Sequence, residues 1–372
     1  MKRLLYLSLA ALMVLAVSCN KNSNGGGKTK SSSVETLEAT DIKTAGACLH
    51  ARISFANDDW DGVNYGFYCG TSEDALDTYI MADELLDEEN AYFAVLSDLV
   101  PDTQYWYKAW AEIDDKEFFG DVKSFKTKFL PEGAIDLGIV ISKDGASHDL
   151  YWAASNLCED GLVDSPELFG DYYAWGETEP HYAKGHSLDN PCSNWRVIDG
   201  KTMTGYNLAN YKWYDNSTGK ITKYNAKQEG GVVDNNLELD CGDDPEDTTI
   251  DDAARYVLGG KWRMPTKGEW EALQKQCKWD WTDNYNDIGI KGFIVKSQVP
   301  GYTGSSIFLP AAGERESNAL RRRNEAGFYW SSSLKETASV PLSWQIQLGY
   351  TGTMMHDCNR DYGCPVRPVY EE

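Results

Sequence analysis

Hydrophobic and polar residues alternate in short runs over much of the chain, and turn-forming residues separate these runs. Between residues 34 and 128, the pattern predicts strands at 47–55, 63–70, 92–96, 104–113 and 117–126. Successive side chains of a strand point to opposite faces, and short strands at this spacing favour two packed sheets over a barrel. We therefore expect an all-β sandwich over residues 34–128.

A different periodicity marks the second half of the chain, after a Pro-Gly hinge at residues 129–133. Trp270, Leu273 and Cys277 recur at helical spacing, which predicts a helix over residues 267–277 with one buried stripe. Thr266 and Glu269 have the spacing of a capping box, and Pro265 before Trp270 fits a hydrophobic staple. We assign Thr266, Glu269 and Trp270 structural roles.

Arg263 is the residue of this segment that capping does not explain. It lies between Trp262 and Met264, so we expect it to be partly buried and paired with a carboxylate. The candidate partners are Asp251, Asp252 and Glu269. A substrate clamp is the alternative interpretation, and a structural ion pair is favoured because arginine commonly pins loops to a helix start.

The segment LVPDTQY at residues 99–105 resembles the corner of fibronectin type III domains. The resemblance implies a fibronectin type III-like sandwich in which the hydroxyl of Tyr105 bonds to upstream backbone. Trp106 and Trp110 then lie on the opposite face of the same strand. We favour burial of these rings under long side chains or a neighbouring domain over a binding face.

The N-terminus combines a basic start at Lys2 and Arg3 with an apolar run too short to span a bilayer comfortably, followed by LAVSC. This pattern resembles a bacterial lipoprotein signal. The resemblance implies a signal peptide over residues 1–18 and acyl chains on Cys19 that attach the protein to the outer membrane. Residues 19–33 are polar and Gly-rich, which predicts a flexible tether. The periplasmic and cell-surface locations both stay open.

Composition narrows the classes of partner and of chemistry. The chain has 58 acidic and 35 basic residues, a net charge of −23, which argues against nucleic acid as a partner. The sequence contains no phosphate-binding glycine loop and no H-E-x-x-H motif, and its five histidines offer little material for acid-base chemistry. No Cys or His pair has zinc-ligand spacing. We therefore do not expect an enzyme.

Five motifs of the second half resemble the Fibrobacter major paralogous domain family. The resemblance covers residues 134–370 and implies an α+β, C-type-lectin-like fold whose first and last strands pair. It also implies a distant similarity to formylglycine-generating enzymes and no established activity. The motifs are DDAA at 251–254, GKWRMPT at 260–266, IFLPAAG at 307–313, YWSS at 329–332 and VRPV at 366–369.

Residues 176–250 are rich in Gly, Asn, Asp and Tyr, and are longer than a simple connection requires, so we expect the ligand-binding surface there. Aromatic rings can stack on sugars. The candidate rings are Trp195, Tyr211, Trp213 and Tyr214. A run of acids in the same region is a candidate calcium site, although its spacing does not match an EF-hand and a solvated loop is the other interpretation. These acids are Asp240, Asp243, Asp244 and Asp247.

We therefore expect a membrane-anchored lipoprotein that displays a lectin-like domain to a glycan or protein ligand. The first alternative is a structural adhesin or fimbria-associated subunit. The weaker alternative is an oxidase of the formylglycine-generating type, which the resemblance links to a copper-binding cysteine pair. Cys358 and Cys364 are the nearest match, but their position just before the last strand counts against this activity.

Overall fold

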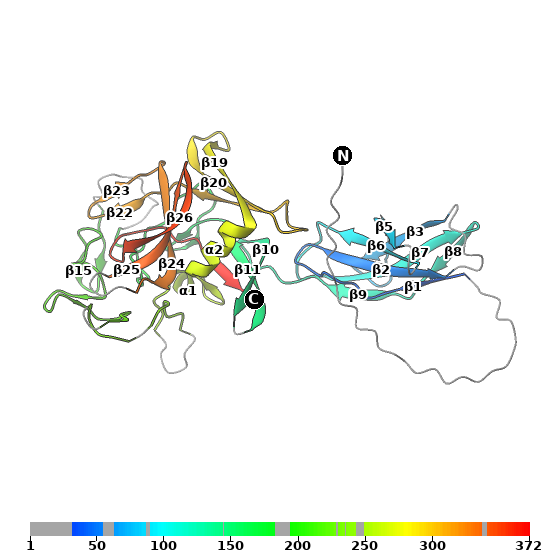
Figure 1. Ribbon diagram of the computed structural model, residues 1–372, viewed down its shortest axis with the longest axis horizontal. Coiled ribbons are helices and arrows are strands. Elements are labelled where there is room, and N and C mark those ends of the chain that lie inside the picture. Colours follow the sequence, from blue (N-terminus) through cyan, green and yellow to red (C-terminus); the bar gives the residue numbers. More distant parts are fainter. Residues whose placement is uncertain are drawn as a thin grey trace. The chain divides into compact units, whose positions relative to one another are not determined.

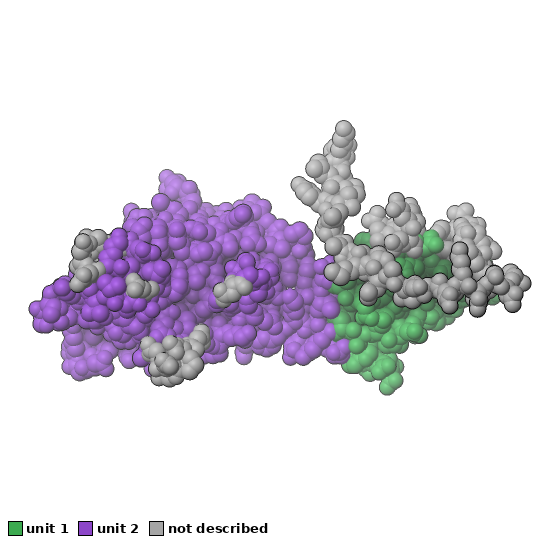
Figure 2. All heavy atoms as spheres, turned by 60° about the horizontal axis from the view of Figure 1, so that its bottom comes forward, with its two compact units in different colours: residues 1–40, 48–95, 105–125 green, residues 41–47, 96–104, 126–372 purple. Residues whose placement is uncertain are grey.

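The computed structural model describes residues 32–54, 63–86, 90–143, 145–182, 194–227, 230–234, 236–242, 249–336 and 341–372. The predicted signal peptide, Cys19 and most of the predicted tether lie outside these residues. The chain divides into two compact units, shown in Figures 1 and 2, which comprise residues 1–40, 48–95 and 105–125, and residues 41–47, 96–104 and 126–372. In the described part of the chain, no helix has the length and apolarity needed to cross a membrane.

The first unit consists of two antiparallel sheets. Tyr92 links them, because its ring lies 5.1 Å from that of Phe67 and its hydroxyl donates to the carbonyls of Gly66 and Trp110. One sheet has the order β1 (Ser33–Thr36), β2 (Ala47–Ser54), β6 (Ala91–Leu96), β5 (Glu84–Leu86). The other has the order β4 (Thr78–Met81), β3 (Asn64–Gly70), β7 (Gln104–Ile113), β8 (Lys116–Phe119), with β9 (Lys123–Lys126) also paired to β7.

Most of the predicted strands of this unit are present, with one correction. The run at 117–126 forms two strands, β8 and β9, because Gly120–Val122 interrupts the pairing. Strands β1, β4 and β5 were not predicted, since they are only three or four residues long and carry little periodicity.

Strand β7 places its two tryptophans on the outer face, as expected. Tyr105 is buried and stacks on Phe125, with ring centroids 5.6 Å apart. On the other face, Trp110 packs edge-on against Tyr68 and Tyr79 and donates its indole N–H to Glu117. The ring of Trp110 is therefore covered by side chains of its own unit, which supports the structural interpretation of this residue.

In its described residues, the second unit is mostly β-sheet, with two helices of 6 and 10 residues, α1 (Ala253–Leu258) and α2 (Lys267–Gln276). Its helical content is therefore small for the expected α+β class. Three sheets form its framework. They are β10 (Ala134–Lys143), β11 (Ala146–Ala153), β27 (Val369–Glu371) and β18 (Trp262–Arg263); β19 (Cys277–Tyr285), β20 (Ile290–Ser297) and β21 (Ser306–Pro310); and β24 (Ala326–Leu334), β25 (Leu342–Gly349) and β26 (Gly352–Asn359).

Four short hairpins complete the described strands of this unit and lie in the segments that connect the sheets. They are β12 (Leu157–Cys158) with β13 (Gly161–Leu162), β14 (Val197–Ile198) with β15 (Lys201–Thr202), β16 (Tyr214–Asp215) with β17 (Lys220–Ile221), and β22 (Glu314–Glu316) with β23 (Ala319–Arg321). The hairpin formed by β10 and β11 lies beside the last strand of the unit, because β27 pairs with β11.

Helix α2 spans nearly the predicted residues and buries the predicted stripe. Trp270, Leu273 and Cys277 are at most 4% exposed and belong to the main core cluster of the unit. The indole of Trp270 lies 4.7 Å from that of Trp152 on β11 and donates its N–H to the carbonyl of Trp330 on β24. One helix face therefore joins two of the three sheets.

A buried arginine connects the start and the end of the second unit. Arg367 is fully buried, and its guanidinium donates at 2.8–3.0 Å to the side-chain oxygen of Asn156 and to the carbonyls of Ala153, Ala154 and Phe308. Burial lowers the pKa of Arg367 to about 10. These four bonds hold the end of β11 and strand β21 beside the segment that leads into β27.

We expect Arg367→Met to lower the free energy of unfolding by at least about 3 kcal/mol, because several buried oxygens lose their donor at once. Urea denaturation measures this loss. Arg321→Met is the matched control, since its side chain is 58% exposed, and we expect little change. Equal midpoints for the two variants would contradict the proposed role of Arg367.

Candidate functional site

A cavity of about 1150 Å³ opens in the second unit, where strand β18 and the start of helix α2 meet the end of β27. Apolar lining comes from Val140, Ile141, Leu239 and Ala272. Its charged lining is mixed in sign. The acids are Glu238, Asp240, Glu269, Glu371 and Glu372, and the bases are Lys143, Arg255, Lys261 and Arg263, with His148 in addition. No phenylalanine, tryptophan or tyrosine ring occurs among the described residues that line this cavity.

Arg263 forms the centre of one wall, in an ion cluster that we call the Arg263 cluster: Arg263, Glu269 and Glu371. Its guanidinium donates to both carboxylate oxygens of Glu269, at 2.6 and 2.8 Å, and to one oxygen of Glu371 at 2.7 Å. The arginine side chain is only 12% exposed. Such a buried guanidinium is stable only when carboxylates or carbonyls accept its hydrogens.

The capping box predicted at the start of α2 is confirmed. The hydroxyl of Thr266 accepts from the amide of Glu269 at 3.2 Å, and the carboxylate of Glu269 accepts from the amide of Thr266 at 2.7 Å. Glu269 therefore serves the helix and Arg263 at the same time. The capping box does not remove this segment from the candidate site, because Arg263, Thr266 and Glu269 all line the cavity.

Two of the three predicted partners of Arg263 have other contacts. Asp252 caps α1 by accepting from the amides of Ala254 and Arg255. Asp251 accepts from Lys212 and Lys223. Of the three candidates, Glu269 is the one that pairs with Arg263, and the two aspartates serve other contacts.

Glu371 is the partner that sequence analysis missed. It lies far along the chain and reaches Arg263 because β18 pairs with β27 in the register Arg263 to Val369. Lys143 also donates to Glu371, at 3.1 and 3.2 Å. Burial alone would raise the pKa of the Glu371 carboxyl, but Arg263 and Lys143 hold it below its ordinary value. Glu371 is therefore ionised at neutral pH.

The long region 176–250 also lines the cavity, through residues 236 and 238–241. Glu238 accepts hydrogen bonds of 2.6 Å from the hydroxyls of Ser332 and Ser333. Asp240 accepts from the amide of Gly242 and from the hydroxyl of Thr249. Among its described residues, the region that we expected to carry the ligand surface thus reaches the cavity only through residues 236 and 238–241.

The four aromatic candidates of that region are held by packing within the unit. Tyr211 is 2% exposed and donates to the carbonyl of Trp175, so its ring is not available for stacking on a sugar. Trp213 donates to the carbonyl of Gly176, and the ammonium groups of Lys212 and Lys223 lie 4.3 and 5.3 Å from its ring. Trp195 and Tyr214 are partly buried and pack against the hydrophobic cluster that contains Tyr211.

Of the four acids predicted to bind calcium, the structure describes Asp240. Asp240 lies 3.7 Å from the ammonium of Lys223, and a neighbouring cation opposes the binding of a second one. Asp243, Asp244 and Asp247 lie outside the described residues. Calcium binding by this segment therefore stays a prediction.

A buried histidine holds the first part of the long region in place. His181 is fully buried, and its Nε2 lies 2.6 Å from a carboxylate oxygen of Glu177. Its ring stacks on Tyr206 at 4.6 Å, and its Nδ1 lies 3.2 Å from the carbonyl of Gly205. Burial alone would lower the pKa of His181, but the carboxylate of Glu177 and its hydrogen bond raise it above the ordinary value.

Comparison with known proteins leaves the family of the chain open. No family model matches the sequence, and no curated protein matches it either. The resemblance to the Fibrobacter major paralogous domain family therefore stays a prediction.

Solved structures match only part of the chain. The sensor domain of the anti-sigma factor RsgI4 in Pseudobacteroides cellulosolvens is 17% identical, with a TM-score of 0.22, over 27% of this chain and 94% of that one. A fibronectin type III domain derived from human KIAA0970 protein is 18% identical, with a TM-score of 0.19, over 26% of this chain and 74% of that one. Similarities of this size assign no function to the chain.

The capping box makes a prediction about stability. Thr266→Ala removes the hydroxyl that accepts from the Glu269 amide, so we expect a loss of about 1 kcal/mol in the free energy of unfolding. Thr266→Ser keeps the acceptor and should retain most of that stability. Chemical denaturation of both variants measures the difference, and an alanine variant as stable as the serine variant would refute this role.

The buried His181 predicts a pH dependence. Because its folded pKa is raised, its stabilisation is fully present below about pH 6.5, the ordinary histidine pKa, and is lost as the pH rises through the folded value. We expect the unfolding free energy of the native chain to fall over this window relative to that of His181→Gln. Urea denaturation from pH 6 to 9 gives both curves, and parallel curves would rule out this linkage.

Proposed function

We propose that the chain is a bacterial outer-membrane lipoprotein, anchored through an acylated Cys19, that binds a ligand in the cavity beside the Arg263 cluster. In this proposal the first unit is a fibronectin type III-like spacer and the second a C-type-lectin-like binding domain. The cavity supports this function most directly, because its volume suits a small ligand or a short part of a larger one. The lipoprotein-like N-terminus supports the anchor.

The charges of the cavity favour a neutral, polar ligand. Five carboxylates and four cationic side chains face one space, so a strongly charged ligand would meet repulsion on one side. A glycan offers hydroxyl groups that both donate and accept, which matches such mixed walls. Because no phenylalanine, tryptophan or tyrosine lines the described cavity, recognition rests mainly on hydrogen bonds rather than on stacking.

Two exposed residues on the walls are placed to contact such a ligand. Lys261 lies just before β18, and Asn236 lies two residues before Glu238 in the long region. Neither belongs to the Arg263 cluster, so both can be changed without breaking the ion pairs that hold the wall. Substitution of these two residues therefore tests recognition of the ligand while the fold keeps its stability.

We expect the purified chain to bind a subset of glycans on an array, and the double change Asn236→Ala with Lys261→Ala to weaken binding by about tenfold, the value of one or two hydrogen bonds. Asn216→Ala with Lys278→Ala is the matched control, since both residues are exposed and lie outside the cavity. Titration of the best glycan gives the dissociation constants, with and without calcium.

Three outcomes would oppose the proposal. Loss of binding in Trp213→Ala or Tyr214→Ala, with the cavity variant unchanged, would move the site to the aromatic loops. Absence of glycan binding together with recovery of a specific protein partner would favour the adhesin or fimbria-associated role. Turnover of a cysteine-containing peptide with oxygen would favour the oxidase.

A further inference from the structure

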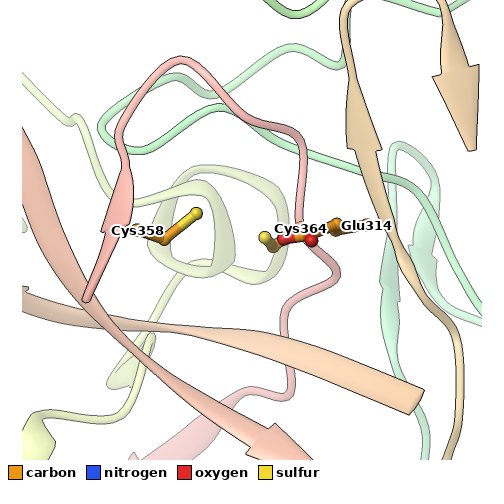
Figure 3. Close-up of side chains that lie close together, drawn as sticks. All are labelled: Glu314, Cys358 and Cys364. Carbon is orange, nitrogen blue, oxygen red and sulfur yellow. The ribbon is translucent and has the colours of Figure 1, made fainter. Parts of the chain in front are cut away.

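Two cysteines and a glutamate come together in the interior of the second unit, away from the cavity. The sulfur atoms of Cys358 and Cys364 and a carboxylate oxygen of Glu314 all lie within 4.8 Å of one another. Figure 3 shows the two thiols pointing toward each other, with the carboxylate of Glu314 beside Cys364. Cys358 is 7% exposed and Cys364 is fully buried, so protein encloses the two thiols, while Glu314 is partly buried.

The fold brings these residues together from separate elements. Cys358 lies near the end of β26, and Cys364 lies in the segment that follows it. Glu314 begins the hairpin β22–β23, and the next residue, Arg315, exchanges backbone hydrogen bonds of 2.7 and 2.9 Å with Gly363. This pairing places Glu314 next to Cys364. Tyr173 fixes Cys364 from the other side through two backbone bonds of 3.0 Å.

Further polar groups of strand β25 lie at the same place. The thiol of Cys364 donates to the amide oxygen of Gln345 at 3.3 Å. Ser343 lies directly opposite Cys358 in the sheet and on the same strand face as Gln345. The hydroxyl of Ser343 is fully buried and has no hydrogen-bond partner within the described part of the chain. Buried polar groups are normally satisfied, and a ligand held between the thiols would have this hydroxyl as a further polar neighbour.

We propose that Cys358, Cys364 and Glu314 bind a thiophilic divalent cation, zinc, with the amide oxygen of Gln345 as the fourth ligand. Two sulfurs and one carboxylate oxygen are donors that zinc accepts in a tetrahedral arrangement, with Zn–S bonds of about 2.3 Å and Zn–O bonds of about 2.0–2.2 Å. The two S–H bonds break on binding, their protons leave to solvent, and two Zn–S bonds form. The enclosed position makes this a structural site.

A disulfide between Cys358 and Cys364 is the competing state. The two residues carry separate thiols in the structure. A disulfide would consume both sulfurs and leave the carboxylate of Glu314 and the amide of Gln345 without a cation to contact. The convergence of four donor atoms from three strands and a loop favours the metal.

The site is tested on the full chain, purified without chelator. We expect elemental analysis to find one zinc per chain, and cobalt substitution to give the near-ultraviolet absorption of a thiolate-to-metal charge transfer. Cys358→Ser and Glu314→Gln should each weaken zinc at least about 100-fold, since loss of an outer-shell partner alone costs up to that amount. Cys277→Ser is the matched control, because Cys277 is equally buried but belongs to a different core cluster.

Several results would overturn the proposal. These are a Cys358–Cys364 disulfide found by mass spectrometry of peptides alkylated without reduction, an absence of zinc, or zinc affinity unchanged in Cys358→Ser. Glu314→Gln keeps the test decisive if the cysteine variants fail to fold, because it is nearly isosteric and keeps both thiols. Circular dichroism verifies the fold of each variant before metal is measured.

Discussion

The guanidinium of Arg263 imposes the constraint on which the candidate site depends. A charged group that is only 12% exposed needs carboxylates around it, and the fold supplies them from the first turn of α2 and from the last strand, β27. The Arg263 cluster therefore fixes three elements against one another at one end of the cavity. The same ion pairs hold the domain together and shape the space in which we propose that the ligand binds.

A second buried arginine also holds the last strand in place. Arg367 precedes β27 and donates to oxygens near the end of β11 and on β21, so the last strand is held by one guanidinium on each side. The C-terminal segment thus belongs to the framework of the unit, and the cavity has a rigid wall. A rigid wall suits recognition, because polar groups that are fixed before binding need less ordering when a ligand arrives.

The aromatic residues of the long region illustrate how one composition permits two roles. Tyr211, Trp213 and Trp195 could have formed a stacking surface, yet each packs within the unit, and the first two donate hydrogen bonds to the carbonyls of Trp175 and Gly176. Irregular backbone has few ladder partners, so buried phenol and indole groups satisfy its carbonyls instead. Richness in aromatics here marks a folded loop region, and the first described residue of this region that lines the cavity is Asn236.

The sequence by itself determined what depends on near neighbours: most strands of the first unit, the span of α2, its capping box and its buried stripe. These follow from alternation and from contacts three or four residues apart, which a sequence displays directly. Only the tertiary structure decided the partners that strand pairing brings together. Glu371 reaches Arg263 through the register of β18 and β27, and Glu314 reaches Cys364 through the pairing of Arg315 with Gly363. Spacing along the chain did not support a zinc site, because the third ligand of the site that we propose lies on a different element, and the pairing of strands sets such proximity.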